Sequence, residues 1–373
     1  MDGIYRRPFF FAWVVSYICT SLFWKGLSNM SKWGKSIQIA ATYIGTVVGA
    51  GFASGQEILA FFTSHGHWGT IGIFLATCLF VWLGYKMMLY SHKIGSKSYE
   101  SFNNAMFGPI IGRVVNLLVF ITLLGVTTVM LAGSGSVLDE KFGIPYLLGV
   151  ILTIVLSLMV LSKGLNQLLA VNAIVVPMML VFSCLILATG DVSNPIPVNE
   201  PHTFGFIWKA ILYVSFNLAM AQSVLVPIGS HIQDVRILKR AAFLGGAGLG
   251  FMLIIAHGAM LTHWDDVHML DVPLVYITEE WNQMLQLFFV LVLYAEIFTT
   301  LISNIFGITQ QLREIFTVQE HTLYLILFLV SFLFCLIGYS QLLLFFYPLF
   351  GYLGLATMLR VSMNFPIPRL RRK

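Results

Sequence analysis

Apolar runs of about 20 residues recur along most of the chain, and short polar linkers separate them. An α-helix of that length crosses the roughly 30 Å hydrocarbon core of a bilayer. The pattern therefore predicts an all-α polytopic membrane protein with about ten transmembrane helices. The expected spans are Ser36–Phe62, Trp68–Tyr90, Pro109–Gly133, Tyr146–Leu161, Leu165–Thr189, Phe204–Ser230, Ala241–His263, Leu285–Gly307, Thr322–Tyr339 and Gln341–Arg360.

The composition excludes a soluble globular protein. Hydrophobic residues make up 58% of the chain and charged residues 10%, with a mean hydropathy of +0.86, whereas a soluble domain carries about 25% charged residues. The net charge of +5 is then no sign of nucleic-acid binding, and the bilayer is the expected partner. The cysteines lie in apolar runs without the spacing of a metal site, so we expect no resident metal or cofactor. They are Cys19, Cys78, Cys184 and Cys335.

The distribution of basic residues predicts the orientation. If the residues before the first span are cytoplasmic, most of the 21 Lys and Arg residues lie in inside segments, and only Lys141 and Lys209 lie in outside segments. This bias follows the positive-inside rule. We therefore expect both ends of the ten-helix core in the cytoplasm.

The first 30 residues do not fit this arrangement. The apolar stretch Phe9–Trp24 follows Arg6 and Arg7, as in a signal sequence, but a cleaved signal would place the next residues outside. The alternatives are an eleventh span and an upstream start codon, with the natural chain beginning at Met30. We expect residues 1–30 to form an N-terminal extension or an extra hydrophobic segment.

Ten spans divide into two sets of five. An odd number of spans per set inserts the two sets with opposite orientations, as in the inverted repeats of secondary transporters. Span one centres on Gly49 and span six on Asn217, so both of these helices are expected to be broken. The expected domains are the first repeat at residues 31–190, the second at 204–362, and a basic cytoplasmic tail at 363–373.

Span one carries three glycines near its middle, Gly49, Gly51 and Gly55. Each costs a helix about 1 kcal/mol relative to alanine. Where a helix unwinds, free N–H groups can hold a carboxylate and free carbonyls can hold a cation. The alternative interpretation of the glycines is that they let two continuous helices pack closely. Glu57 favours a binding site, because a charge deep in a span costs about 2.5–3.5 kcal/mol and usually marks a pathway. Otherwise Glu57 is a carboxylate at the membrane rim.

Span six carries polar side chains at mid-membrane, namely Asn217, Gln222 and Ser223. These can pair helices or bind a ligand. Pro227 also leaves the carbonyl of Ser223 without its usual helical partner. The pattern favours a second broken helix beside the first.

Span eight contains Glu296, Thr299, Thr300 and Ser303, whose spacing places pairs of them on one helix face. Their oxygen atoms can coordinate a cation, or they can bond neighbouring helices. Of the 16 acidic residues, only Glu57 and Glu296 lie in predicted spans. These two carboxylates are therefore the candidates for proton coupling.

Motifs of soluble catalysis are missing from the sequence. It contains no Gly-x-x-x-x-Gly-Lys phosphate loop and no His-Glu-x-x-His metal motif. We therefore expect neither direct use of ATP nor an enzyme.

The motif Gly49–Glu57 within the ten-span plan resembles the amino acid–polyamine–organocation superfamily, and in particular its YkvI-type bacterial membrane proteins. The run Gly45–Gly51 is similar to the unwound first helix of the leucine transporters. The resemblance implies their 5+5 inverted repeat, secondary transport and a location in the bacterial plasma membrane. It also implies that the carbonyls of Gly45 and Val48 face a sodium ion and that the amides of Ala50 and Gly51 face a substrate carboxylate.

The sodium site that the resemblance implies would also use the hydroxyl groups of Thr299 and Thr300. Glu296, Phe52 and Gln56 depart from the pattern of the sodium-coupled relatives. Coupling to protons is therefore the alternative to coupling to sodium.

We expect a secondary active transporter of a small amino-acid-like or organic solute, coupled to sodium or protons. The alternative is a non-transporting ligand sensor on the same fold, like the amino-acid-sensing subunits of spore germinant receptors. A homo-oligomer is a further expectation. The residues expected to bind the solute are Gly49, Ala50, Gly51, Phe52, Ser54, Gln56, Asn217, Gln222 and Ser223. The residues expected to couple an ion or proton are Gly45, Val48, Glu57, Glu296, Thr299, Thr300 and Ser303.

Overall fold

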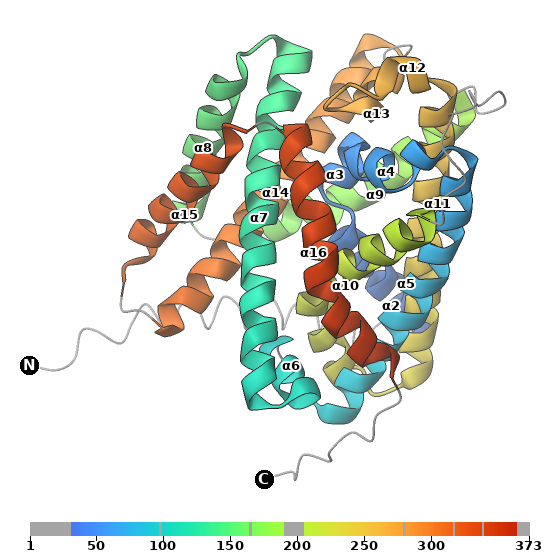
Figure 1. Ribbon diagram of the computed structural model, residues 1–373, viewed down its shortest axis with the longest axis vertical. Helices are drawn as coiled ribbons and strands as arrows, with labels where there is room; N and C mark the ends of the chain where they lie inside the picture. Colours follow the sequence, from blue (N-terminus) through green and yellow to red (C-terminus); the bar gives the residue numbers. More distant parts are fainter. Residues whose placement is uncertain are drawn as a thin grey trace, which may run out of the picture.

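The computed structural model describes residues 31–96, 99–163, 166–189, 205–278, 281–315, 318–337 and 339–363, and all regular structure in these residues is helical. The predicted N-terminal extension and nearly all of the predicted basic tail lie outside the described residues. The helices form one bundle, in which α7 runs along the full height, α8 and α15 lie at one edge, and α5 and α11 lie at the opposite edge (Figure 1). The elements are α2 (Lys32–Val47), α3 (Ala50–Ser54), α4 (Gln56–Phe61), the 3-10 turn η1 (Thr63–His65), α5 (His67–Ile94), α6 (Tyr99–Phe107), α7 (Pro109–Phe142), α8 (Tyr146–Lys163), α9 (Asn166–Thr189), α10 (Gly205–His231), α11 (Val235–Thr262), α12 (Trp264–Val267), α13 (Pro273–Ile277), α14 (Gln283–Ile315), α15 (Glu320–Cys335) and α16 (Tyr339–Ser362).

The predicted spans are confirmed as helical elements. Six of the described helices are long and apolar enough to cross a membrane, and the shorter apolar helices include parts of α8, α9 and α15. The first predicted span is divided among α2, α3 and α4. Helix α7 has 34 residues and is about 51 Å long at 1.5 Å per residue, so it extends well beyond the predicted span.

The predicted break in the sixth span is wrong. Helix α10 runs without interruption for 27 residues, with Pro227 inside it. The polar side chains that suggested a break instead bond to carbonyls of their own helix: Asn217 donates to Tyr213 at 3.0 Å and Gln222 donates to Ala219 at 2.8 Å. These bonds satisfy amide donors within the helix, and α10 continues through Pro227 although the proline removes a backbone hydrogen bond.

Helix α10 lies at the centre of the bundle, where it packs against α2, α5 and α16. The aromatic ring of Tyr213 in this helix contacts Phe61, Phe62 and Phe80, with ring centroids 5.3, 5.0 and 5.9 Å apart. The contacts with Phe62 and Phe80 are edge-to-face and the contact with Phe61 is tilted. Aromatic pairs of this kind contribute beyond the apolar area that each ring buries. They fix the end of the broken first span against α5 and α10.

Small residues let α5 and α10 approach closely. A Cβ atom on Gly229 would lie 2.8 Å from the Cα atom of Met88, closer than a carbon atom can approach backbone without displacing it. Glycine is therefore required at this crossing, as in other membrane-helix contacts.

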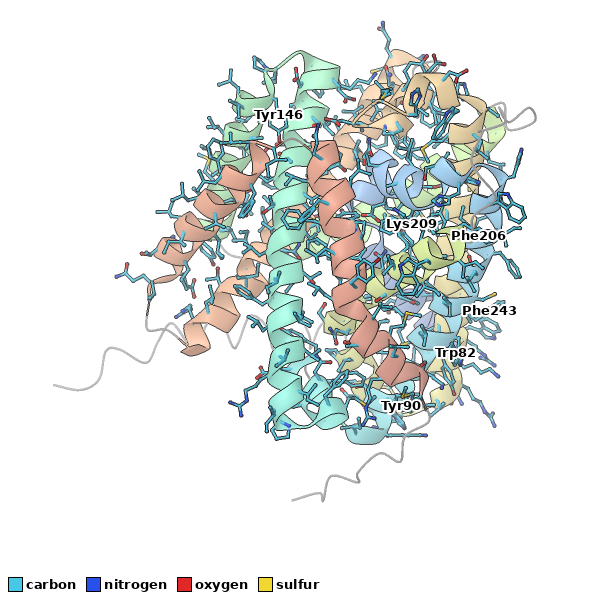
Figure 2. The ribbon with its side chains drawn as sticks, viewed as in Figure 1. Trp82, Tyr90, Tyr146, Phe206, Lys209 and Phe243 are labelled. Carbon is cyan, nitrogen blue, oxygen red and sulfur yellow. The ribbon has the colours of Figure 1, made fainter. Side chains whose placement is uncertain are left out.

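Large apolar side chains point away from the bundle, which fits contact with lipid. Trp82 on α5 and Phe243 on α11 are 45% and 61% exposed and lie on the outer flank of these helices (Figure 2). Exposed apolar surface on this scale is unusual in a soluble monomer. In a bilayer it is solvated by acyl chains.

Candidate functional site

The first span is broken at two points. Helix α2 ends at Val47, and Gly49 has an extended backbone with φ −120° and ψ −170°. Helical bonding resumes where the N–H of Ala53 donates to the carbonyl of Gly49 at 2.9 Å. The second break is at Gly55, whose φ of 91° is in the left-handed region that favours glycine. The break predicted at Gly49 is confirmed, and the glycine at position 55 marks a second one.

A small cavity lies beside the first break, between the broken span and helices α7, α10, α14 and α16. Its volume is about 30 Å³, which is room for roughly two water molecules. The cavity lining comes from both predicted five-helix sets. The lining residues are Gly45, Thr46, Val47, Val48, Gly49, Glu57, Val126, Met130, Phe216, Asn217, Met220, Thr300 and Tyr347.

Glu57 is the only acidic residue among the described residues that line the cavity, and it is 2% exposed. It packs against the backbone of α3. A Cβ atom on Gly51 would lie 2.6 Å from the Cγ atom of Glu57 and 2.7 Å from the hydroxyl oxygen of Tyr347. Glycine at this position therefore lets a carboxylate and a hydroxyl group converge on the helix backbone.

The hydroxyl groups of Tyr213 and Tyr347 lie near the carboxylate of Glu57. Neither hydroxyl group forms a hydrogen bond of normal length and angle with this carboxylate. The Oε2 atom of Glu57 and both hydroxyl oxygens have no hydrogen-bond partner among the described residues. A buried polar group without a partner costs about 1–3 kcal/mol, so this cluster is suited to bind something from outside the chain.

The structure gathers six of the predicted site residues on this one cavity. They are Gly45, Val48, Gly49, Glu57, Asn217 and Thr300. Ala50 and Gly51 form the first turn of α3 directly beside it. The roles of these residues remain predictions.

Phe52, Ser54 and Gln56, the other residues predicted in the first span, are not among the residues that line this cavity. Phe52 lines a separate apolar cavity that also includes Phe182 and Leu274. The hydroxyl group of Ser54 lies 2.9 Å from that of Tyr339, and the side-chain amide of Gln56 donates to the carbonyl of Leu270. The contacts of Ser54 and Gln56 connect the broken first span to α16 and to the segment between α12 and α13.

Gln222, Ser223, Glu296 and Thr299, which are also predicted as site residues on α10 and α14, are not among the described residues that line the cavity. Gln222 is buried, whereas Ser223 is exposed and donates to a carbonyl of its own helix at 2.8 Å. Glu296 is 3% exposed, and its Oε2 atom has no hydrogen-bond partner among the described residues. The Thr299 hydroxyl donates to the carbonyl of Glu296 at 3.2 Å, and Ser303 follows one turn later on α14.

Sequence reasoning missed the aromatic residues of the site, Tyr213, Phe216 and Tyr347. They lie in predicted spans, where an aromatic residue is usually read as core or lipid-facing. A tyrosine at mid-membrane needs a partner for its hydroxyl group, and this requirement was the available signal.

The segment with α12 and α13 covers the break on the side predicted to face outward (Figure 1). A Cβ atom on Gly55 would lie 2.8 Å from the Cγ atom of Leu274 in α13. The same segment is attached to α7, because Ser136 donates to the carboxylate of Asp271 at 2.8 Å and the N–H of Asp271 donates to Glu140 at 3.1 Å. The segment is therefore held over the second break, at Gly55.

Comparison with known proteins identifies relatives along most of the chain, although no family model matches it. The chain is 34% identical to the uncharacterized membrane protein YkvI of Bacillus subtilis (strain 168) over 327 residues, which is 87% of this chain and 94% of that protein. It is 24% identical to the uncharacterized protein YyaD of the same organism over 324 residues, covering 87% of this chain and 95% of that protein.

Among solved structures, the inward-facing conformation of Mhp1 matches with a TM-score of 0.65 at 14% identity, over 88% of this chain and 76% of that one. A mutant of the manganese transporter of Eremococcus coleocola matches with a TM-score of 0.60 at 13% identity, over 89% of this chain and 80% of that one. Mhp1, a nucleobase-cation-symport-1 family transporter, also matches in its closed conformation with bromovinylhydantoin bound, with a TM-score of 0.52 at 13% identity, over 89% of this chain and 73% of that one. These matches confirm the predicted leucine-transporter-like fold.

Proposed function

This chain belongs to the family of the membrane protein YkvI, and from that premise we propose that it is a secondary active transporter of a small amino-acid-like or organic solute. The proposed location is the bacterial plasma membrane, with both ends of the ten-helix core in the cytoplasm. The observation that carries the proposal is the cavity beside the broken first span, which combines a buried carboxylate with residues from both five-helix sets. Secondary transporters bind their solutes at such a point, near mid-membrane and next to a discontinuous helix.

The arrangement of the covering segment supports alternating access. The segment with α12 and α13 lies over the second break of the first span, on its predicted outer side, and Gln56 bonds to Leu270 in this segment. This arrangement fits a transporter that is closed to the outside in this conformation.

Two couplings fit the residues present. One cavity is lined by Gly45, Val48 and Thr300. The backbone carbonyls of Gly45 and Val48 and the hydroxyl group of Thr300 offer oxygen ligands for sodium. Glu296 offers a buried carboxylate for a proton. Among the described residues, no group of three or more His, Cys, Asp or Glu side chains that could hold a metal ion occurs.

A flux screen tests the proposal. The full-length protein is reconstituted in liposomes, and labelled amines, amino acids and other small organic solutes are offered with an imposed sodium gradient, an imposed proton gradient or neither. We expect one class of solute to accumulate above the level in empty liposomes, and only when one of the two gradients is present. A solute that stabilises the protein without ever crossing the membrane would instead support the ligand sensor. No flux and no stabilisation by any solute would refute both.

A further inference from the structure

The carboxylate of Glu57 has no cationic partner in the part of the chain that the structure describes. The described lining residues include no Lys, Arg or His, and the polar groups near the carboxylate are the hydroxyls of Tyr213 and Tyr347. An ionised carboxylate buried without a counter-charge is strongly unfavourable. A cation from outside the chain would supply the missing counter-charge, and its attraction to the carboxylate would offset the desolvation of both groups.

The rest of the lining suits an organic cation better than a bare metal ion. The rings of Phe216 and Tyr347 have centroids 4.7 Å apart, and Val126, Met130 and Met220 supply apolar surface. Aromatic faces attract ammonium groups, and the attraction strengthens when water is excluded. A bare metal ion would use only the oxygen-bearing part of the lining, whereas an ammonium group with its first carbon atom also gains from the aromatic and apolar walls.

An anionic group is disfavoured at the same point. The amides at the start of α3 are the feature that could hold a carboxylate, but α3 has only 5 residues, so its dipole is small. The carboxylate of Glu57 already packs against Gly51 in this helix. A solute carboxylate would meet a like charge there.

The size of the cavity limits the group that it can hold in this conformation. A volume of about 30 Å³ accepts a group of one or two heavy atoms. An ammonium group with its first carbon atom fits that description. A larger solute would extend into space that opens in another conformation.

We propose that the cavity recognises the solute by a small alkylammonium group, held between the carboxylate of Glu57 and the rings of Phe216 and Tyr347. This inference rests on the proposed function, because it takes the cavity as the solute site. It narrows the solutes to amines, including amino acids that are recognised by their ammonium group.

Thermal unfolding of the purified full-length protein tests the inference. The probes are ethylammonium, the neutral analogue ethanol, the anion acetate, and sodium alone, at matched ionic strength. We expect only ethylammonium to raise the unfolding temperature, by a few degrees at saturation. In Glu57→Gln the apparent affinity should fall tenfold or more, whereas Glu100→Gln, the same change at an exposed site on α6, should leave it unchanged.

Several results would overturn the inference. These are equal stabilisation by ethanol or acetate, stabilisation by sodium alone that depends on Glu57, no stabilisation by ethylammonium, and full ethylammonium affinity in Glu57→Gln. If Glu57→Gln does not fold, Phe216→Leu replaces it, because this change removes one aromatic face and keeps apolar bulk. Unchanged affinity in that variant counts against the inference. Ethylammonium binding without flux of any amine would refute the transporter and leave this inference standing. Flux of anions only would refute this inference and leave the proposed transporter standing.

Discussion

A methyl group added at Gly51 tests whether the carboxylate of Glu57 is held against the broken span. In Gly51→Ala the new Cβ atom would lie 2.6 Å from the Cγ atom of Glu57 and 2.7 Å from the Tyr347 hydroxyl oxygen. Both side chains are buried, with exposures of 2% and 0%, so neither can move aside into solvent. Overpacking of this kind costs about 1–3 kcal/mol, and the better helix propensity of alanine offsets up to about 1 kcal/mol.

Gly49→Ala is the matched control, two residues away in the same break. A Cβ atom on Gly49 meets nothing within 4 Å, and its φ of −120° is open to alanine. Here the substitution should stabilise the protein by about 0.4–1 kcal/mol, because it restricts the unfolded chain. The two variants should therefore differ by about 1–3 kcal/mol, with Gly51→Ala the less stable.

Tryptophan fluorescence during heating in detergent measures the difference. Unfolding of a protein of this kind is commonly irreversible, so the apparent midpoints are compared at one fixed heating rate. We also expect Gly51→Ala to lose the response to ethylammonium, since the carboxylate is displaced. If Gly51→Ala is as stable as Gly49→Ala and responds normally, Glu57 does not occupy the position described.

Three further substitutions probe the fold and the coupling. Gly229→Ala should lower the yield of folded protein sharply, because its Cβ atom would lie 2.8 Å from the Cα atom of Met88 on α5; normal yield and stability would contradict the close crossing. Tyr43→Phe should lower the stability by about 1 kcal/mol, since the Tyr43 hydroxyl donates to the Phe80 carbonyl at 3.0 Å, and an unchanged unfolding midpoint would show that this bond contributes nothing. Glu296→Gln should keep ethylammonium binding in the thermal assay but lose uptake driven by a proton gradient, whereas uptake that is unchanged would exclude Glu296 as the proton carrier.

The positions of the membrane spans could be predicted because hydrocarbon imposes one requirement on every span, a long apolar stretch with internally bonded backbone. The same rule does not determine where a helix breaks. Gly49 and Gly55 lie at real breaks, whereas Pro227 lies inside the continuous helix α10. Helix α10 stays continuous while its polar side chains bond to carbonyls of the same helix. No sequence motif indicates whether polar side chains will bond in this way or lie beside a break.

The site was predictable only in part, for a reason of the same kind. Glu57 was identifiable from the sequence because a carboxylate within an apolar span is rare and costly. Tyr213 and Tyr347 were not, because aromatic residues are common in spans and their sequence positions do not reveal which of them meet. Tyr347 lies on α16, far along the chain from Glu57, and only tertiary packing brings both to Gly51.

Thiol labelling at position 300 tests most directly whether the cavity is the solute site. Thr300 is partly buried and lines the cavity, and Thr300→Cys is made in a protein whose 4 native cysteines are replaced by serine or alanine. The rate of modification by a small membrane-permeant maleimide is measured with and without ethylammonium. We predict that the introduced thiol reacts and that ethylammonium slows the reaction, but not when Glu57→Gln is also present. A rate that ethylammonium leaves unchanged would contradict the assignment of this cavity as the solute site.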